Sequence, residues 1–144
     1  MLVVARVAFL GIPVWIALDM LLSAAGPAWL HAAFDLPFNV LCHRLPERTL
    51  SLTGVAMPLC SRCAGLYLGL SLSAAIAWPE LSGRALRVVV PLSAALLAIE
   101  VITQDLGLHP VFHPTRFLSG LLVSVPLGGA LGAVIKRNAG AQRG

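Results

Sequence analysis

Three cysteines and a histidine gather within 22 positions of a chain that is otherwise strongly apolar. Cys42 and His43 are adjacent, and Cys60 and Cys63 form a Cys-x-x-C pair. Thiolate and imidazole are the ligands that suit tetrahedral Zn²⁺, whereas a Cys-x-x-C pair can also exchange between dithiol and disulfide. We therefore predict a metal site at Cys42, His43, Cys60 and Cys63, with a redox site as the alternative.

The Cys60/Cys63 pair is expected at the mouth of an apolar helix. A helix N-terminus and the cation of Arg62 would both favour the thiolate, which binds metals and attacks disulfides. In a helical turn Cys60, Cys63 and Tyr67 would share one face. Free cysteines also serve as small buried apolar residues, but the clustering of these three among arginines argues against that interpretation.

Ionisable side chains are predicted to collect at the same end of the molecule. Glu100 and Gln104 are four residues apart and therefore share a helix face. Intramembrane carboxylates usually pair with cations, so we expect Glu100 or Asp19 to pair with an arginine; an ion pair that only fixes helix register is the alternative. The predicted supporting cluster comprises Arg44, Arg48, Arg62, Tyr67, Asp19, Glu100, Gln104 and Arg116.

The other three histidines are expected near the same membrane edge. His109 and His113 are candidate extra ligands or proton carriers, although simple solvation is the commoner fate of a loop histidine. His31 lies close to Trp29 near the end of the first apolar segment, where such residues typically mark the membrane interface.

Composition identifies the class of protein that must position these residues. Of 144 residues, 58% are hydrophobic and 11% are charged, against roughly a quarter charged in soluble domains. The net charge of +4 comes from basic residues scattered between apolar runs, as in short membrane loops. We expect an integral membrane protein in contact with the lipid bilayer, and no nucleic-acid partner.

The expected fold class is all-α, a bundle of four transmembrane helices in a single membrane domain over residues 1–144. Each apolar segment approaches the length of about 20 residues needed to cross a bilayer. The predicted spans are residues 7–25, 58–78, 86–102 and 117–135. A long Cys/His-containing first loop, residues 26–57, is expected to hold a short helix near Leu50, and residues 136–144 form a polar tail.

Small residues recur at helical spacing on two of these spans. Their faces comprise Gly65, Gly69 and Ser73 on the second and Gly120, Ser124, Gly128 and Gly132 on the fourth. Such faces let helices approach closely in lipid. We predict helix packing through them, within the chain or in a homo-oligomer.

The basic residues also predict an orientation. With the termini and the 80–87 turn on one side, that side holds six Lys/Arg and the other holds four. Cytoplasmic loops carry the excess of Lys/Arg, so both termini are expected in the cytoplasm. The cysteine motif would then face outward.

These motifs resemble a known family. The matching stretches are Cys42-His43-Arg44, Pro46-Glu47-Arg48-Thr49, Gly54 and Pro58-Leu59-Cys60-Ser61-Arg62-Cys63-Ala64-Gly65-Leu66-Tyr67-Leu68-Gly69. They resemble the signature of small prokaryotic membrane proteins called "domain of unknown function 2085". Glu100 to Gln104 and Arg116 to Gly120 extend the resemblance over residues 34–130, with Glu100 where Asp and Thr49 where Ser is usual. It implies a multi-pass protein of the prokaryotic cytoplasmic (inner) membrane with a motif-defined site, and no established chemistry.

Three functions remain open at this point, and the residues leave undecided whether the protein is an enzyme. The first is zinc binding at the membrane edge, either structural or as part of metal handling. The second is a membrane thiol–disulfide oxidoreductase, linked to a quinone, in which Cys60, Cys63, Cys42 and Arg62 would act. The third is a scaffold that the polar cluster only stabilises. An odd cysteine beside a histidine suits a ligand set better than a redox relay, whereas outward-facing thiols favour disulfides.

Overall fold

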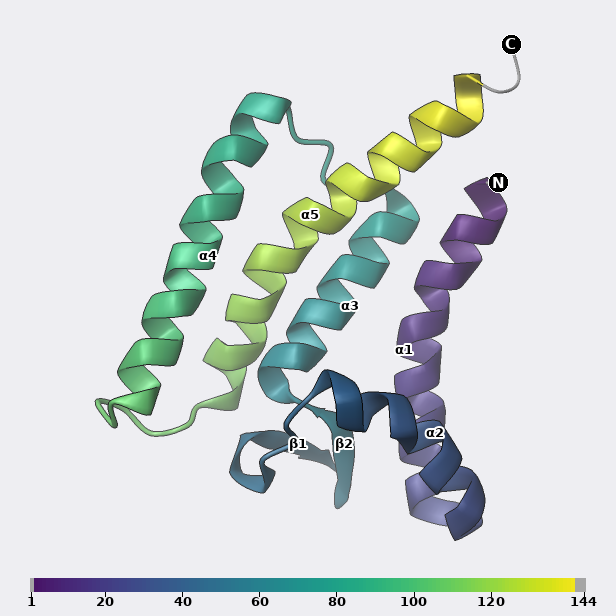
Figure 1. Cartoon of the computed structure of the whole chain (residues 1–144), viewed down its shortest axis with the longest axis vertical. Coiled ribbons are helices and arrows are strands. Elements are labelled where there is room, and N and C mark those ends of the chain that lie inside the picture. Colours follow the sequence, from purple (N-terminus) through teal and green to yellow (C-terminus); the bar gives the residue numbers. More distant parts are fainter. Residues whose placement is uncertain (1, 142–144) are drawn as a thin grey trace.

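The computed structural model describes residues 2–141, which fold into a helical bundle with a small sheet at one end (Figure 1). The elements follow in the order α1 (Leu2–Ala25), α2 (Ala28–Leu41), the 3-10 helix η1 (Pro46–Arg48), β1 (Thr49–Leu52), β2 (Val55–Cys60), α3 (Ser61–Ile76), α4 (Gly83–Asp105) and α5 (His113–Ala141). Helices α4, α5, α3 and α1 lie side by side in that order, while α2 and the hairpin cover one end (Figure 1).

Three of the helices are long and apolar enough to cross a membrane: α1 from Val3, α4 and α5. Helix α4 presents an apolar stripe to the outside, formed by Val88, Leu92, Leu96 and Ile99. A soluble monomer rarely exposes so much contiguous apolar surface. These faces are therefore suited to contact with lipid.

The second expected span, residues 58–78, differs from the prediction at its start. Residues Val55–Cys60 form strand β2, and helix α3 begins only at Ser61 and ends at Ile76. Its 16 residues extend about 24 Å, whereas the hydrocarbon core is about 30 Å thick. Helix length and composition thus identify three spans among residues 2–141, where four were expected.

The predicted packing through small residues occurs within the chain, between α3 and α5. A Cβ on Gly65 would meet the carbonyl oxygen of Phe117, and one on Gly120 would meet that of Arg62. Gly128 is equally close to Leu70. Both small-residue faces therefore serve packing within the chain, and the homo-oligomer stays a prediction.

The predicted first loop, residues 26–57, is mostly regular structure. Helix α2 turns back against α1, where the Trp15 indole N–H donates to the Phe34 carbonyl over 3.0 Å. The expected short helix near Leu50 is instead strand β1, paired antiparallel with β2. Thr53 and Gly54, both at positive φ, form the two-residue turn that joins the strands, a conformation that favours glycine and matches strand twist.

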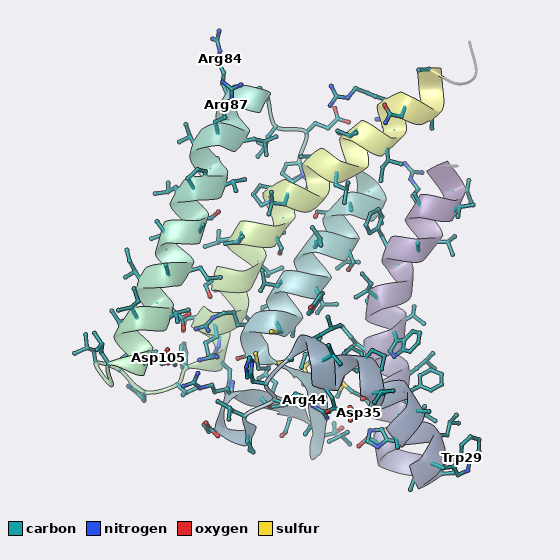
Figure 2. All side chains as sticks on the ribbon, in the orientation of Figure 1. Trp29, Asp35, Arg44, Arg84, Arg87 and Asp105 are labelled. Atoms are coloured by element: carbon teal, nitrogen blue, oxygen red, sulfur yellow. The ribbon has the colours of Figure 1, made fainter. Side chains whose placement is uncertain are left out.

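Charged side chains lie at the two ends of the bundle and leave its middle apolar. Figure 2 shows Arg84 and Arg87 at one end and Asp35, Arg44 and Asp105 at the other. The hydrophobic core also lies towards the second end; it comprises Ile16, Phe38, Cys42, Met57, Leu59 and Ala64. This buried apolar cluster therefore contains one cysteine of the motif, Cys42, and packs against the other two.

Candidate functional site

Local backbone structure brings the distant halves of the motif together. Helix α2 ends at Leu41, and the N–H of the next residue, Cys42, still bonds to the Phe38 carbonyl over 2.9 Å. The chain then turns at Arg44, which adopts a positive φ of 49°, and the hairpin carries it back so that β2 ends at Cys60. Cys60 therefore directly precedes α3, at the positive end of that helix.

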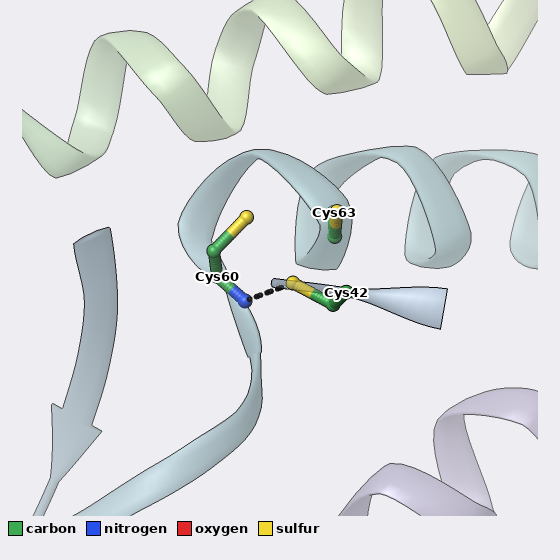
Figure 3. A group of neighbouring side chains, drawn as sticks. All are labelled: Cys42, Cys60 and Cys63. Atoms are coloured by element: carbon green, nitrogen blue, oxygen red, sulfur yellow. Dashed lines mark hydrogen bonds between the residues drawn. The ribbon is translucent and has the colours of Figure 1, made fainter. Parts of the chain in front are cut away.

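The three cysteine sulfurs form one group. Those of Cys42, Cys60 and Cys63 all lie within 4.8 Å of one another, and all three residues are free thiols. The Cys60 N–H donates a hydrogen bond to the Cys42 sulfur over 3.3 Å (Figure 3). Cys42 is buried and the other two are half-buried. The structure thus joins the Cys42 region to the Cys-x-x-C pair in a single pocket.

His43, expected as the fourth ligand, has a different position. Its side chain is exposed, and it is not a member of the sulfur group among the described residues. It contributes instead to the wall of a neighbouring cavity of about 450 Å³. This cavity is lined by Leu41, Cys42, His43, Arg44, Leu45, Arg48, Cys60, Arg62, Cys63 and Arg116.

Three of the four arginines of this cavity are paired with carboxylates. Arg62 forms an ion pair with Glu100 of α4, with its Nε 3.1 Å from the carboxylate. The other two pairs are Arg48 with Asp105 at 3.2 Å and Arg44 with Asp35 at 2.6 Å. The Glu100–Arg62 pair is one of those expected from the sequence.

Arg116 is the exception among these cations. Its side chain is 1% exposed and donates to the Gln104 side-chain oxygen. Its Nε has no hydrogen-bond partner, and no carboxylate lies within ion-pair distance in residues 2–141. A buried charge without a counter-ion is costly, so Arg116 needs negative charge from the adjacent site.

The thiols are the groups that can supply this charge. A hydrogen bond from the Cys63 thiol lowers the pKa of Cys60, and the nearby Arg116 guanidinium lowers it further. Cys60 is therefore the natural first thiolate of the group. Cys60 precedes α3 as expected, and the cation that lowers its pKa is Arg116, where Arg62 was expected.

The remaining predicted site residues lie around the sulfur group or outside it. Tyr67 packs against the core that contains Cys42. His113 lies 3.3 Å from the Ser61 hydroxyl, and His109 lies 3.0 Å from that of Thr103; neither belongs to the sulfur group. Asp19 forms no ion pair with an arginine of residues 2–141 and instead faces His31 of α2 at 3.7 Å.

Two acidic residues of the site were missed from the sequence. Asp35 and Asp105 hold Arg44 and Arg48 in place at the cavity rim. Asp35 lies four residues after His31, a spacing that shares a helix face. Because residues 26–57 were expected to form a loop, this spacing did not predict a shared helix face.

Comparison with known proteins identifies the family of this chain. Residues 42–129 match the family described as "Predicted membrane protein (DUF2085)". The chain belongs to this family. The match begins at Cys42 and includes all three cysteines, the Arg62–Glu100 and Arg48–Asp105 pairs, and Arg116 with Gln104. DUF2085 membership and the apolar helices identify an integral membrane protein.

Two archaeal proteins, both described as uncharacterised, are similar to this DUF2085 chain. One from Methanothermobacter thermautotrophicus is 59% identical over 32 residues, which cover 22% of this chain and 29% of that protein. One from Methanocaldococcus jannaschii is 31% identical over 90 residues, covering 59% of this chain and 57% of that protein. The chain therefore spans less than two thirds of either relative. No solved structure matches.

Proposed function

We propose that Cys42, Cys60 and Cys63 bind one zinc ion at the membrane edge. The observation that carries this proposal is the grouping of their three sulfurs within 4.8 Å. In a tetrahedral site with Zn–S bonds of about 2.3 Å, two sulfurs lie about 3.8 Å apart. Small side-chain rotations would close the remaining difference. Thiolate is also the ligand class that selects zinc over harder divalent ions.

Charge balance supports the same proposal. A zinc ion with three thiolates carries one net negative charge, and Arg116 supplies an otherwise unmatched positive charge beside it. The Cys60 N–H bond to the Cys42 sulfur is of the kind that stabilises a thiolate ligand. The zinc–thiolate centre and the Arg116 cation would together be close to neutral.

The fourth coordination position would face the arginine-lined cavity. Structural zinc sites usually have four protein ligands, whereas sites that bind other molecules keep one position open. With His43 on the cavity rim, exposed, the fourth ligand would be exchangeable. The ion would hold the end of α2 to the start of α3. An exchangeable fourth ligand would also let another molecule take up the ion, as metal handling requires.

We further propose that α3 is a fourth membrane crossing and that both termini are cytoplasmic. The start of α1 and the end of α5 lie at the same end of the bundle (Figure 1), which requires an even number of crossings. Helix α3 connects the end of the bundle that holds the sheet to the end where α4 begins. Although α3 is short, it packs between the apolar helices α1 and α5. The Lys/Arg excess favours cytoplasmic termini in a prokaryotic inner membrane. Protection of tags at both termini from external protease in intact cells would support this orientation, and digestion of either would contradict it.

A thiol–disulfide oxidoreductase is the second candidate, favoured by the Cys-x-x-C pair at the start of α3 and the lowered pKa of Cys60. Oxidation of Cys60 and Cys63 to one disulfide would release two electrons and two protons, which a membrane quinone would take up to become a quinol. An apolar cavity of about 340 Å³ between α1, α2 and Tyr67 lies close to the cysteine core. The third cysteine in the group has no assigned part in such a cycle.

Metal analysis of purified, reduced, chelator-free protein separates these two functions. We expect one zinc per chain in the wild type and its loss in Cys60→Ser and Cys63→Ser. His109→Gln, a change outside the sulfur group, is the matched control and should retain the ion. Three results together would replace zinc binding with the oxidoreductase function. The protein would lack stoichiometric metal, form a Cys60–Cys63 disulfide in cells, and reduce quinone only with Cys60 intact.

A further inference from the structure

A second group of metal-ligating side chains lies between α1 and α2, apart from the cysteines. It comprises Asp19 of α1 and His31 and Asp35 of α2, with one ligand atom of each within 4.8 Å of the others. His31 and Asp35 are four residues apart and so project from the same face of α2. That face packs against α1, where Asp19 lies.

The carboxylate oxygens of this group lack the partners that buried oxygens require. Asp19 is 2% exposed, and its Oδ1 has no hydrogen-bond partner among residues 2–141. Oδ1 of Asp35 is likewise buried, and no described residue forms a hydrogen bond with it. Buried polar atoms are nearly always satisfied, and leaving a carboxylate oxygen unsatisfied in an apolar setting is costly.

The neighbouring side-chain donors do not meet this need. Arg44 donates to Oδ2 of Asp35 at 2.6 Å, and the Asn39 amide donates to the same oxygen at 3.3 Å. Both leave Oδ1 of Asp35 free. The His31 Nε2 lies 3.7 Å from Oδ1 of Asp19, beyond hydrogen-bond distance. A proton on this nitrogen would satisfy Oδ1 of one aspartate but not Oδ1 of the other.

We propose that Asp19, His31 and Asp35 form a second divalent-cation site, which binds a first-row transition ion through one imidazole nitrogen and two carboxylate oxygens. A bound cation would satisfy both orphaned oxygens at once. Ligand atoms about 2.1 Å from such an ion lie roughly 3.0–3.4 Å apart. The 3.7 Å between His31 and Asp19 needs only a small adjustment to reach that spacing.

The ligand set determines which ions fit. Carboxylate with imidazole suits Mn²⁺ and Fe²⁺, whereas thiolates select softer ions such as Zn²⁺. Mg²⁺ is disfavoured because it prefers oxygen ligands in near-ideal octahedral geometry. The two sites of this chain would therefore differ in ion preference.

Arg44 connects the two sites. It holds Asp35 and also lines the cavity beside the cysteines. Binding at the second site is nevertheless carried by residues outside the sulfur group, so it does not depend on zinc at the cysteines. The two proposals can fail separately.

Mn²⁺ titration of the full-length protein in detergent tests the second site, because Mn²⁺ has little affinity for thiolates. Bound ion is measured as the loss of the sharp electron paramagnetic resonance signal of free aqueous Mn²⁺. We expect one Mn²⁺ per chain in the wild type. Asp19→Asn and His31→Gln should each weaken binding by about tenfold or more, since even outer-shell changes commonly cost that much.

Two controls keep the experiment decisive. His109→Gln removes a histidine outside the group and should leave Mn²⁺ binding unchanged. His31→Gln alters a partly exposed side chain, so its result holds even where Asp19→Asn unfolds the protein. Wild-type protein that binds no Mn²⁺, or His31→Gln protein that binds it with unchanged affinity, would overturn the second site and leave the zinc proposal intact.

Discussion

The Cys60 N–H donates a hydrogen bond to the Cys42 sulfur over 3.3 Å, although 18 positions separate the two residues. This bond joins the C-terminal end of α2 to the start of α3, across the whole β hairpin. The two halves of the cysteine motif are thus connected by backbone geometry as well as by their side chains.

The α3–α5 interface should be sensitive to a single methyl group. Gly65→Ala would place a Cβ against the Phe117 backbone carbonyl, which cannot rotate away. We expect destabilisation of about 1–3 kcal/mol, as for other overpacked contacts, measured by thermal unfolding in detergent. Gly140→Ala, in open space on α5, is the control and should be neutral or slightly stabilising. Equal melting temperatures for the two variants would refute this packing.

The Arg62–Glu100 pair should matter more than an exposed pair. Both side chains are 14% exposed, so Glu100→Gln leaves a nearly buried guanidinium without its counter-ion, at a cost of about 3 kcal/mol. Glu80→Gln breaks the exposed Lys136–Glu80 pair and should cost less than about 1 kcal/mol. Chemical unfolding of the two variants in one detergent gives the comparison. A Glu100→Gln protein as stable as Glu80→Gln would contradict the role of this pair.

Cys60 should be the most acidic of the three thiols in metal-free protein. Because its pKa is lowered by the Cys63 hydrogen bond and by Arg116, its thiolate persists at pH values where an ordinary cysteine is protonated. Alkylation followed by mass spectrometry should show Cys60 modified first as pH rises, with a midpoint below that of the denatured chain. Arg116→Gln should move that midpoint upward. The same midpoint in native and denatured protein would rule out an activated thiol.

The small-residue faces and the cysteine group were accessible from sequence because spacing alone encodes them. Gly65 and Gly120 recur with their neighbours every four residues, which predicts close helix packing, and the structure confirms it between α3 and α5. The Glu100–Arg62 pair followed from the rarity of charge inside apolar segments. In each case a local pattern determined the contact.

The end of the bundle that holds β1 and β2 was not predictable in the same way. Pro58 and Leu59 continue the apolar run of the following helix, and apolarity alone does not distinguish a short buried strand from a helix. Pro37 argued against α2, because proline disfavours the interior of a helix. The contacts of α2 with Trp15 of α1 outweigh the cost of this proline. Without α2, Asp19 was expected to face an arginine, and its approach to His31 was missed.

Zinc K-edge X-ray absorption of the purified protein, loaded with one equivalent of zinc, tests the central claim most directly. The predicted result is a shell of three sulfur atoms at about 2.3 Å from the metal, reduced in a Cys42→Ser variant. A spectrum with only oxygen and nitrogen neighbours would contradict a metal centre at Cys42, Cys60 and Cys63.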